Sequence, residues 1–268
     1  MRLLVVTPTL GRSPYLAAAV DSVSRTGLDL EHVLVAPASA LDRLRTDYPR
    51  CTVVAEASPT GMYAAIDAGV RAAAPWEWFT YLNDDDLLKP GFAEMARRHM
   101  RNADPSAIAY GDVEWIDAEG ASLGRMPIEK SNRHVPYVMK LGLAALTQQG
   151  ALVSRSLYTQ LGGFDIDYRL AADFEFWVRA LAAGASFQYY PHKVASWRIH
   201  AAQASGDRSA AHAEGTRVAA TVPLRASRQR LRWELLRFRL LNAGRYLERR
   251  RNTGTWRSED LFAAAGQG

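Results

Sequence analysis

Three consecutive carboxylates, Asp84, Asp85 and Asp86, follow Asn83 at the end of the short apolar run 78–82. Adjacent carboxylates repel one another, so the run costs stability unless a partner neutralises it. Hard oxygen ligands suit Mg²⁺ or Mn²⁺, and a divalent cation is one candidate partner. The other interpretation is a solvated acidic turn that caps the next helix. The residue types alone leave both interpretations open.

A further carboxylate, Asp173, stands at the start of a helical pattern over residues 171–183. Burial between Phe174 and Phe176 would raise its pKa, as suits a general base. The first turn of a helix would lower that pKa instead. Asp165 and Asp167 belong to a Gly-Gly-Phe-Asp turn and are interpreted as turn-forming residues.

The elements that would position these residues alternate along the first half of the chain. β-Branched apolar runs predict strands over 2–7, 32–36, 52–55 and 78–82. Helical patterns over 15–24, 38–47, 62–74 and 90–102 separate or follow them. This alternation predicts an α/β fold with a doubly wound, mostly parallel sheet flanked by helices. Ligands of such sheets bind beyond the carboxyl ends of the strands, where 83–86 would lie.

The second half is less regular. It predicts strands over 107–116, 150–154, 187–190 and 194–199, and a helix over 171–183. The small, polar stretch 201–215 is interpreted as a loop. Residues 225–251 are rich in arginine and are expected to form one long amphipathic helix.

Composition sets further limits. The chain has 268 residues, 48% of them hydrophobic, and one cysteine. No disulfide can form within it, which favours a reducing compartment. No apolar run approaches the roughly 20 residues that span a bilayer, and the N-terminus is interpreted as a strand and not a secretory signal. A Rossmann dehydrogenase is disfavoured because no Gly-x-Gly-x-x-Gly follows the first strand.

The net charge of +5 is distributed unevenly along the chain. Residues 225–268 hold 11 arginines and 4 acids, whereas the rest of the chain is slightly acidic. We expect two parts, a domain over 1–222 and a basic helical extension over 223–268. The extension has three interpretations: packing on its own domain or on a second subunit, peripheral contact with an anionic membrane, or nucleic-acid binding. The last is disfavoured because the body lacks a recognition motif, and we expect no nucleic-acid partner.

Six segments, in order along residues 2–205, resemble family 2 glycosyltransferases with the GT-A fold. They are the opening nucleotide segment 5–12, the second nucleotide segment 61–69, the carboxylate motif 82–86, the acceptor-side segments 148–151 and 161–165, the base segment 171–177, and the closing motif 198–200 with Ser205. The resemblance implies a GT-A domain that transfers a sugar with inversion from a nucleotide-diphosphate donor. One divalent cation, Mn²⁺ or Mg²⁺, would neutralise the diphosphate leaving group.

The resemblance also implies roles for single residues. Asp86 is the expected metal ligand, with His200 as a further contact, although a surface histidine is an equal alternative. Asp173 is the expected base. Gln149 and Trp177 are expected at the acceptor site; for Gln149 a plain strand-end amide is the alternative. The expected nucleotide-sugar contacts are Thr7, Pro8, Thr9, Arg12, Gly61, Met62, Asp67, Asn83, Asp84 and Asp85.

Two departures from the family pattern concern the nucleotide side. Asp67 stands where asparagine is usual, and residues 35–39 contain no acid. Glu56 or Ser58 could substitute for that acid. Uridine is therefore expected as the nucleobase only because it is usual in the family, and these residues do not themselves indicate it.

The expected function is synthesis of a cell-surface polysaccharide or lipid-linked glycan in the cytoplasm, at the inner face of the membrane. The glycan or lipid-linked acceptor would be its second substrate. A catalytically silent sugar-nucleotide or glycan-binding module is the alternative. A nucleotidyltransferase ranks last because only Gly11 and Arg12 follow the first strand, where a Gly-rich basic loop is needed.

Overall fold

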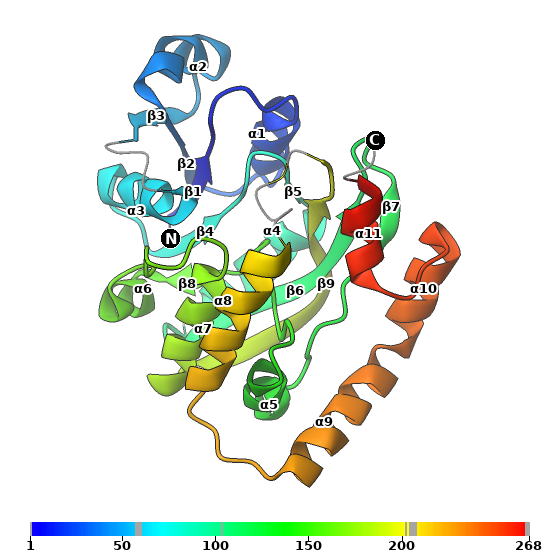
Figure 1. Cartoon of the computed structure of the whole chain (residues 1–268). Helices are drawn as coiled ribbons and strands as arrows, with labels where there is room; N and C mark the ends of the chain where they lie inside the picture. The colour runs from blue at the N-terminus through cyan, green and yellow to red at the C-terminus, as the bar shows by residue number, and fades with distance from the viewer. Residues whose placement is uncertain (1, 57–60, 103, 202, 204–207, 266–268) are drawn as a thin grey trace.

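Two β-sheets form the centre of the protein, and helices cover them (Figure 1). The computed structural model describes residues 2–56, 61–102, 104–201, 203 and 208–265. The first sheet has strand order β3-β2-β1-β4-β8 and the second β5-β9-β6-β7. Strands β1 to β4 run parallel and β8 runs antiparallel to β4; in the second sheet β6 and β9 run parallel. The expected mostly parallel α/β sheet flanked by helices is confirmed.

The strands are β1 (Leu3–Pro8), β2 (Leu30–Ala36), β3 (Thr52–Ala55), β4 (Trp78–Tyr81), β5 (Leu87–Leu88), β6 (Ala107–Ile116), β7 (Ser122–Arg125), β8 (Val153–Ser154) and β9 (Ser186–Arg198). The chain passes from β1 to β2 to β3 in one direction, and β4 then lies on the other side of β1. The order of strands therefore reverses between β1 and β4. Such a reversal opens a crevice at the carboxyl ends of the two strands, where ligands bind.

The crossover helices are α1 (Leu16–Ser24), the short η1 (Ala38–Ala40) with α2 (Leu41–Asp47), and α3 (Met62–Ala72). Helix α3 lies directly on the sheet because of Gly69. A Cβ atom at this position would stand 2.7 Å from a methyl group of Val6 and 2.8 Å from one of Val35. This close contact holds α3 against β1 and β2.

The other helices of the body are α4 (Pro90–Asn102), η2 (Asn132–His134), α5 (Val135–Lys140), α6 (Arg155–Leu161), α7 (Ala172–Ala182) and α8 (Arg208–Thr221).

Two predictions for the second half of the chain were wrong. The two expected strands over 187–199 form one strand, β9, whose register with β6 shifts at Tyr110 and Asp112. Residues 208–215 of the expected loop belong to α8, since several alanines give them helix propensity. Glu214 of α8 accepts hydrogen bonds from the backbone N–H groups of residues 169–171, which ties the helix to the start of α7.

The prediction of one long helix over 225–251 is also wrong. It is divided into α9 (Arg228–Leu241) and α10 (Ala243–Thr253) at Asn242, and α11 (Ser258–Ala265) follows. The side-chain amide of Asn242 exchanges hydrogen bonds with the backbone N–H and C=O of Ile128 and donates to the C=O of Phe238. Side-chain competition for backbone groups ends the helix at this point.

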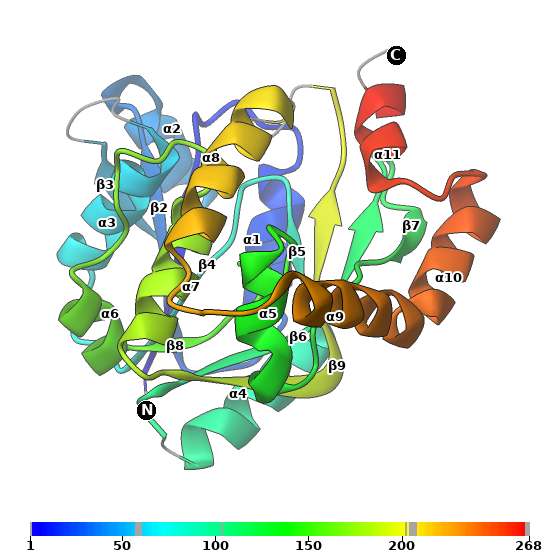
Figure 2. The same ribbon diagram turned by 60° about the horizontal axis from the view of Figure 1, so that its bottom comes forward.

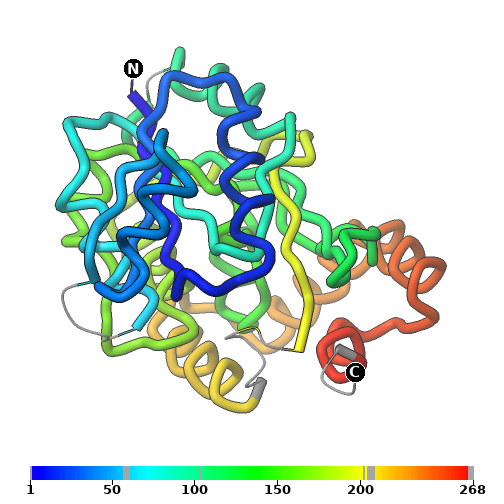
Figure 3. The backbone as a smooth tube through the Cα atoms, turned by 90° about the horizontal axis from the view of Figure 1, so that it is seen from above, coloured from blue at the N-terminus to red at the C-terminus, as the bar shows by residue number. Residues whose placement is uncertain are grey.

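Helices α9 to α11, called the C-terminal arm below, pack against the body along the β6–β7 side. Phe238 and Phe262 belong to the main hydrophobic core, and Phe262 contacts the ring of Trp197 in β9. Figure 2 shows α9 beside α5, and Figure 3 shows the arm on the side opposite α2 and α3. The expected boundary between residues 222 and 223 stays a prediction. No helix in the described ranges is both long and apolar enough to cross a membrane.

Candidate active site

The crevice between β1 and β4 is closed at its base by hydrogen bonds between the two segments that follow these strands. The hydroxyl of Thr9 donates to the carboxylate of Asp84 and accepts from the backbone N–H of Gly11, at 2.9 Å. The hydroxyl of Ser13 donates to the backbone C=O of Asp84, at 3.3 Å. Burial raises the pKa of Asp84 to about 6. The opening segment and the carboxylate motif therefore contact each other directly.

Asp86 is fully buried, and both of its oxygens accept hydrogen bonds from the protein. Oδ1 accepts from the backbone N–H of Arg198 at 2.9 Å, and Oδ2 accepts from Gln149 at 3.1 Å and from Asn83 at 3.3 Å. Burial and the charge of Asp85 hold the pKa of Asp86 well above its usual range. Through these contacts the Asp86 side chain connects the loop after β4 with Gln149 and with Arg198 at the end of β9.

Asp85 and His200 contact each other directly, with Asp85 Oδ2 and His200 Nε2 2.9 Å apart. Both side chains are partly accessible, at 17% and 15%. The ring of His200 lies against Tyr15, with ring centroids 5.0 Å apart. Beside this pair, Asn83 Oδ1 is buried and has no hydrogen-bond partner among the described residues. An oxygen that lacks a partner inside a protein is available to a ligand.

Asp173 lies in the first turn of α7 and is held by Tyr63 of α3. The Tyr63 hydroxyl donates to Asp173 Oδ1 at 3.2 Å, and the backbone N–H of Phe174 donates to the same oxygen at 2.8 Å. Burial raises the pKa of Asp173 to about 6 against these hydrogen bonds. The ring of Tyr81, at the end of β4, packs edge-on against Tyr63, and the charges of Asp86 and Asp173 both act on its hydroxyl. The motif of β4 and the carboxylate of α7 therefore meet around Tyr81.

Two predicted nucleotide-sugar contacts have hydrogen-bond partners within the protein, and one predicted acceptor contact lies in the core. Thr7 is buried, with its hydroxyl 3.0 Å from His32 Nε2. Asp67 accepts from the hydroxyl of Tyr158 and from the backbone N–H of Phe164, so it ties α3 to the turn after α6. Trp177 is 4% exposed in the main core, and its indole Nε1 has no hydrogen-bond partner among the described residues; its expected place at the acceptor site stays a prediction.

The remaining predicted contacts lie at the end of β1 and at the start of α3. Pro8 ends β1, and Arg12 is exposed on the loop that follows. Gly61, with a φ of 113°, and Met62 begin α3. Ser58 and Ser205 lie outside the described residues.

Sequence reasoning missed the roles of Tyr63 and Tyr15, and a contact with phosphate was its less favoured interpretation of Arg198 in the closing motif. The guanidinium of Arg198 donates to the backbone C=O groups of Asp85, Asp117 and Ala118, and it lies over the ring of Tyr15 at 4.4 Å. Arg198 therefore fixes the shape of the carboxylate loop. A tyrosine two residues after the helix-opening glycine was the only available signal for Tyr63.

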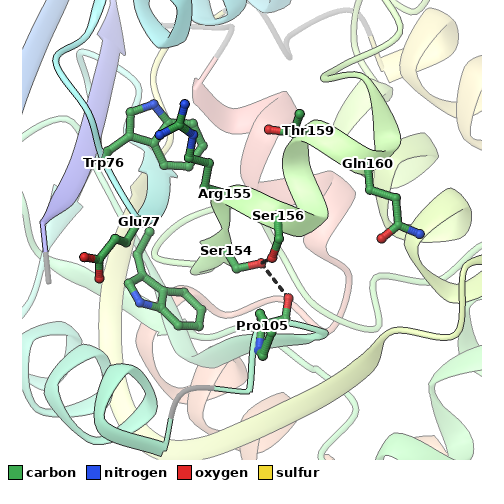
Figure 4. Close-up of a pocket in the computed structure, with 9 residues that line it drawn as sticks. Trp76, Glu77, Pro105, Ser154, Arg155, Ser156, Thr159 and Gln160 are labelled. Carbon is green, nitrogen blue, oxygen red and sulfur yellow. Dashed lines mark hydrogen bonds between the residues drawn. The ribbon is translucent and has the colours of Figure 1, made fainter.

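A separate surface cavity of about 750 Å³ lies at the other end of β4 (Figure 4). Trp76, Trp78 and Arg155 line it, and Ser154 donates a hydrogen bond to the C=O of Pro105 at its edge. Because Trp78 begins β4 whereas the carboxylates follow its end, this cavity is not part of the crevice.

The architecture recurs in solved glycosyltransferases. TarS of S. aureus (residues 1–349), in complex with UDP-GlcNAc, superposes with a TM-score of 0.61 and 13% sequence identity, over 99% of this chain and 79% of TarS. The mannosyltransferase PcManGT of Pyrobaculum calidifontis, in complex with GDP-Man and Mn²⁺, gives a TM-score of 0.59 and 20% identity, over 98% of this chain and 73% of that one. An uncharacterised glycosyltransferase of Bacillus subtilis, YwdF, is 26% identical over 186 residues, 67% of this chain and 68% of YwdF.

The sheet, the crevice at its reversal point and these relatives define a glycosyltransferase with the GT-A fold. The family model described as glycosyl transferase family 2 matches residues 4–162. The chain belongs to this family, as the six ordered segments predicted.

Proposed function

We propose that the protein transfers a sugar, with inversion, from a nucleotide-diphosphate donor to a hydroxyl of a glycan or lipid-linked acceptor. The single observation that supports this most is the set of contacts after β1 and β4: Thr9 with Asp84 and Asp85 with His200, while Tyr63 connects Asp173 to Tyr81 at the end of β4. The solved structures that it resembles hold UDP-GlcNAc or GDP-Man, which supports a nucleotide-sugar donor. Uridine remains the family default for the base.

The residues present suit a divalent cation. Asp85 supplies a carboxylate oxygen and His200 an imidazole nitrogen, and these two atoms lie 2.9 Å apart. Mg²⁺ and Mn²⁺ sites that act on phosphates use one or two protein ligands and leave the other positions to phosphate and water.

Asp85 is a better candidate for the direct ligand than Asp86, which was expected from the sequence. Both oxygens of Asp86 already accept hydrogen bonds, whereas the Asp85 carboxylate faces the crevice and His200. The cation, when bound, would neutralise the charge that develops on the diphosphate. Asp84, Asn83 and the opening segment would hold the ribose and diphosphate.

Asp173 would act as the general base. It removes the proton of the acceptor hydroxyl as that oxygen attacks the anomeric carbon, and the bond to the diphosphate oxygen breaks with its electron pair. Tyr63 holds the carboxylate in position, and burial keeps its pKa close to the range of a useful base.

Calorimetric titration with UDP, GDP, CDP and dTDP, each with and without Mn²⁺, tests the donor side. We expect one nucleotide to bind tightly and only with the metal. Absence of binding by all four would contradict the proposal and favour a silent glycan-binding module.

Asp173→Asn tests the transfer step. We expect this variant to bind the nucleotide like the wild type and to lose transfer by about 10²–10⁴-fold, the usual contribution of a general base. Full turnover would exclude Asp173 as the base. Loss of nucleotide binding as well would show that the residue acts through the fold.

A further inference from the structure

Helix α9 has two different faces. Its inner face carries Glu234, Phe238 and Asn242 at four-residue spacing, and all three are buried against the body. The opposite side carries Trp233, Leu236 and Leu240, which are 49%, 57% and 66% exposed. These three residues, spaced by three and four, are called the outer stripe below. A helix that exposes an apolar stripe and also packs on its own domain has a second partner to contact.

The charges beside the outer stripe are basic. Arg228, Arg232 and Arg239 lie on the same exposed side of α9, and none of them forms an ion pair with any residue that the structure describes. The two acids of α9 and α10 are already engaged, because Glu234 is buried against Arg237 and Glu248 pairs with Arg125. The outer stripe therefore has positive charge along its edge and no acid to offset it.

The ring of Trp233 is held in place although it is half exposed. The Arg230 guanidinium lies over it, 4.8 Å from the ring centroid, and His134 contacts it from η2. An exposed indole that is supported from below presents its ring outward. Aromatic, leucine and arginine side chains on one helix face are typical of helices that lie in a membrane interface.

We propose that the outer stripe of α9 docks the enzyme on an anionic lipid surface. A second copy of this chain fits less well, because a symmetric contact through α9 would bring two unpaired arginine rows together without an acid between them. Anionic headgroups would pair with Arg228, Arg232 and Arg239 while Trp233, Leu236 and Leu240 enter the boundary between headgroups and acyl chains. Figure 1 places α9 at the lower margin of the molecule.

The inference deepens the proposed function, because a surface of this kind would bring the enzyme to a lipid-linked acceptor. It does not depend on donor binding, so the two can fail separately. The crevice is formed by β1, β4, α3 and α7, and none of the outer-stripe residues contacts it.

Sedimentation of the full chain with lipid vesicles tests the proposal. The vesicles are pure phosphatidylcholine, or phosphatidylcholine with one part in three of phosphatidylglycerol. We expect binding to the anionic vesicles only, weakened by high salt. The double variant L236S/L240S should weaken binding at least tenfold, and so should R232Q/R239Q, because each basic residue near such a surface contributes about fivefold in affinity.

Ile166→Ser is the matched control, since Ile166 is 51% exposed but lies far from α9 in the turn before α7. It should bind vesicles like the wild type. All variants should keep the wild-type unfolding temperature and nucleotide affinity, which separates this test from that of the proposed function.

Two results would overturn the inference. One is binding to anionic vesicles that is absent or is unchanged in both double variants. The other is a wild-type dimer in analytical ultracentrifugation that L236S/L240S converts to monomer, because the outer stripe would then be covered by a second copy.

Discussion

Among single residues, the carboxylate run shows most clearly what position in the fold adds to residue type. The sequence places Asp84, Asp85 and Asp86 in one motif but cannot tell which of them turns inward. In the structure the last one is fully buried and accepts three hydrogen bonds, whereas Asp85 faces His200. Partners that decide this, such as Gln149 and Arg198, are 63 and 112 residues away along the chain. Local pattern contains no information on contacts of this kind.

Substitution of the two carboxylates separately should give different results. Asp85→Asn should lose most of the Mn²⁺-dependent gain in nucleotide affinity and keep the wild-type unfolding temperature. Asp86→Asn should lower the free energy of unfolding by about 1–3 kcal/mol, because an amide NH₂ would face buried donors. Calorimetry with and without Mn²⁺, combined with thermal unfolding, measures both. The reverse pattern would restore Asp86 as the direct ligand.

The pH dependence of transfer should report Asp173. Its pKa is raised to about 6, and a base must be unprotonated, so kcat/KM should be level above that pH and fall about tenfold per unit below it. The hydrogen bond from Tyr63 stabilises the charged form. Tyr63→Phe should therefore raise the pKa further and move the acid limb of the profile to higher pH.

Tyr110→Phe is a control for that shift. It also removes a buried hydroxyl hydrogen bond, to the C=O of Glu129 at 2.7 Å, but lies outside the crevice. Its profile should match the wild type. A profile of Tyr63→Phe that does not move would mean that Tyr63 serves only packing.

Among elements, the first half of the fold was predictable and much of the second was not. Strands β1, β2 and β4 and helix α3 follow from apolar runs and helix-opening residues that act over a few positions. The break between α9 and α10 depends on hydrogen bonds from Asn242 to Ile128, and the single strand β9 depends on pairing with β6. Both are tertiary effects that override local pattern.

The contact of α3 with the sheet gives a prediction for an element. Gly69→Ala should destabilise the protein by about 1–3 kcal/mol, because its methyl group would overlap Val6 and Val35. Gly215→Ala, in α8, meets nothing within 4 Å and should be neutral or stabilising by about 0.4–1 kcal/mol. Urea unfolding of both variants measures the difference. Equal stability of the two would show that α3 can move off β1 at little cost.

For the whole molecule, the question is whether the C-terminal arm is a separate module or part of one cooperative structure. Buried polar contacts connect it to the second sheet. Arg245 of α10 is 4% exposed and donates to Asp112 of β6 at 2.5 Å and to the C=O of Met126. The ring of Trp115 in β6 lies beneath Arg249, with the guanidinium 5.5 Å from its centroid. A charge pair and a cation–π contact at such depth couple the arm to the core.

Removal of one partner should therefore destabilise the entire chain. Arg245→Met leaves the carboxylate of Asp112 buried with only Tyr189 and the more distant Arg125, at 3.8 Å, to compensate it. Breaking a buried pair in this way costs about 3–5 kcal/mol. Arg251→Met, on the exposed side of α10, should change the free energy of unfolding by less than about 0.5 kcal/mol. In urea, circular dichroism and tryptophan fluorescence should give one coincident transition for wild type and for Arg245→Met, at lower urea for the variant. Two separate transitions, with the larger one unchanged by Arg245→Met, would instead make the arm an independent module attached to a self-sufficient catalytic domain.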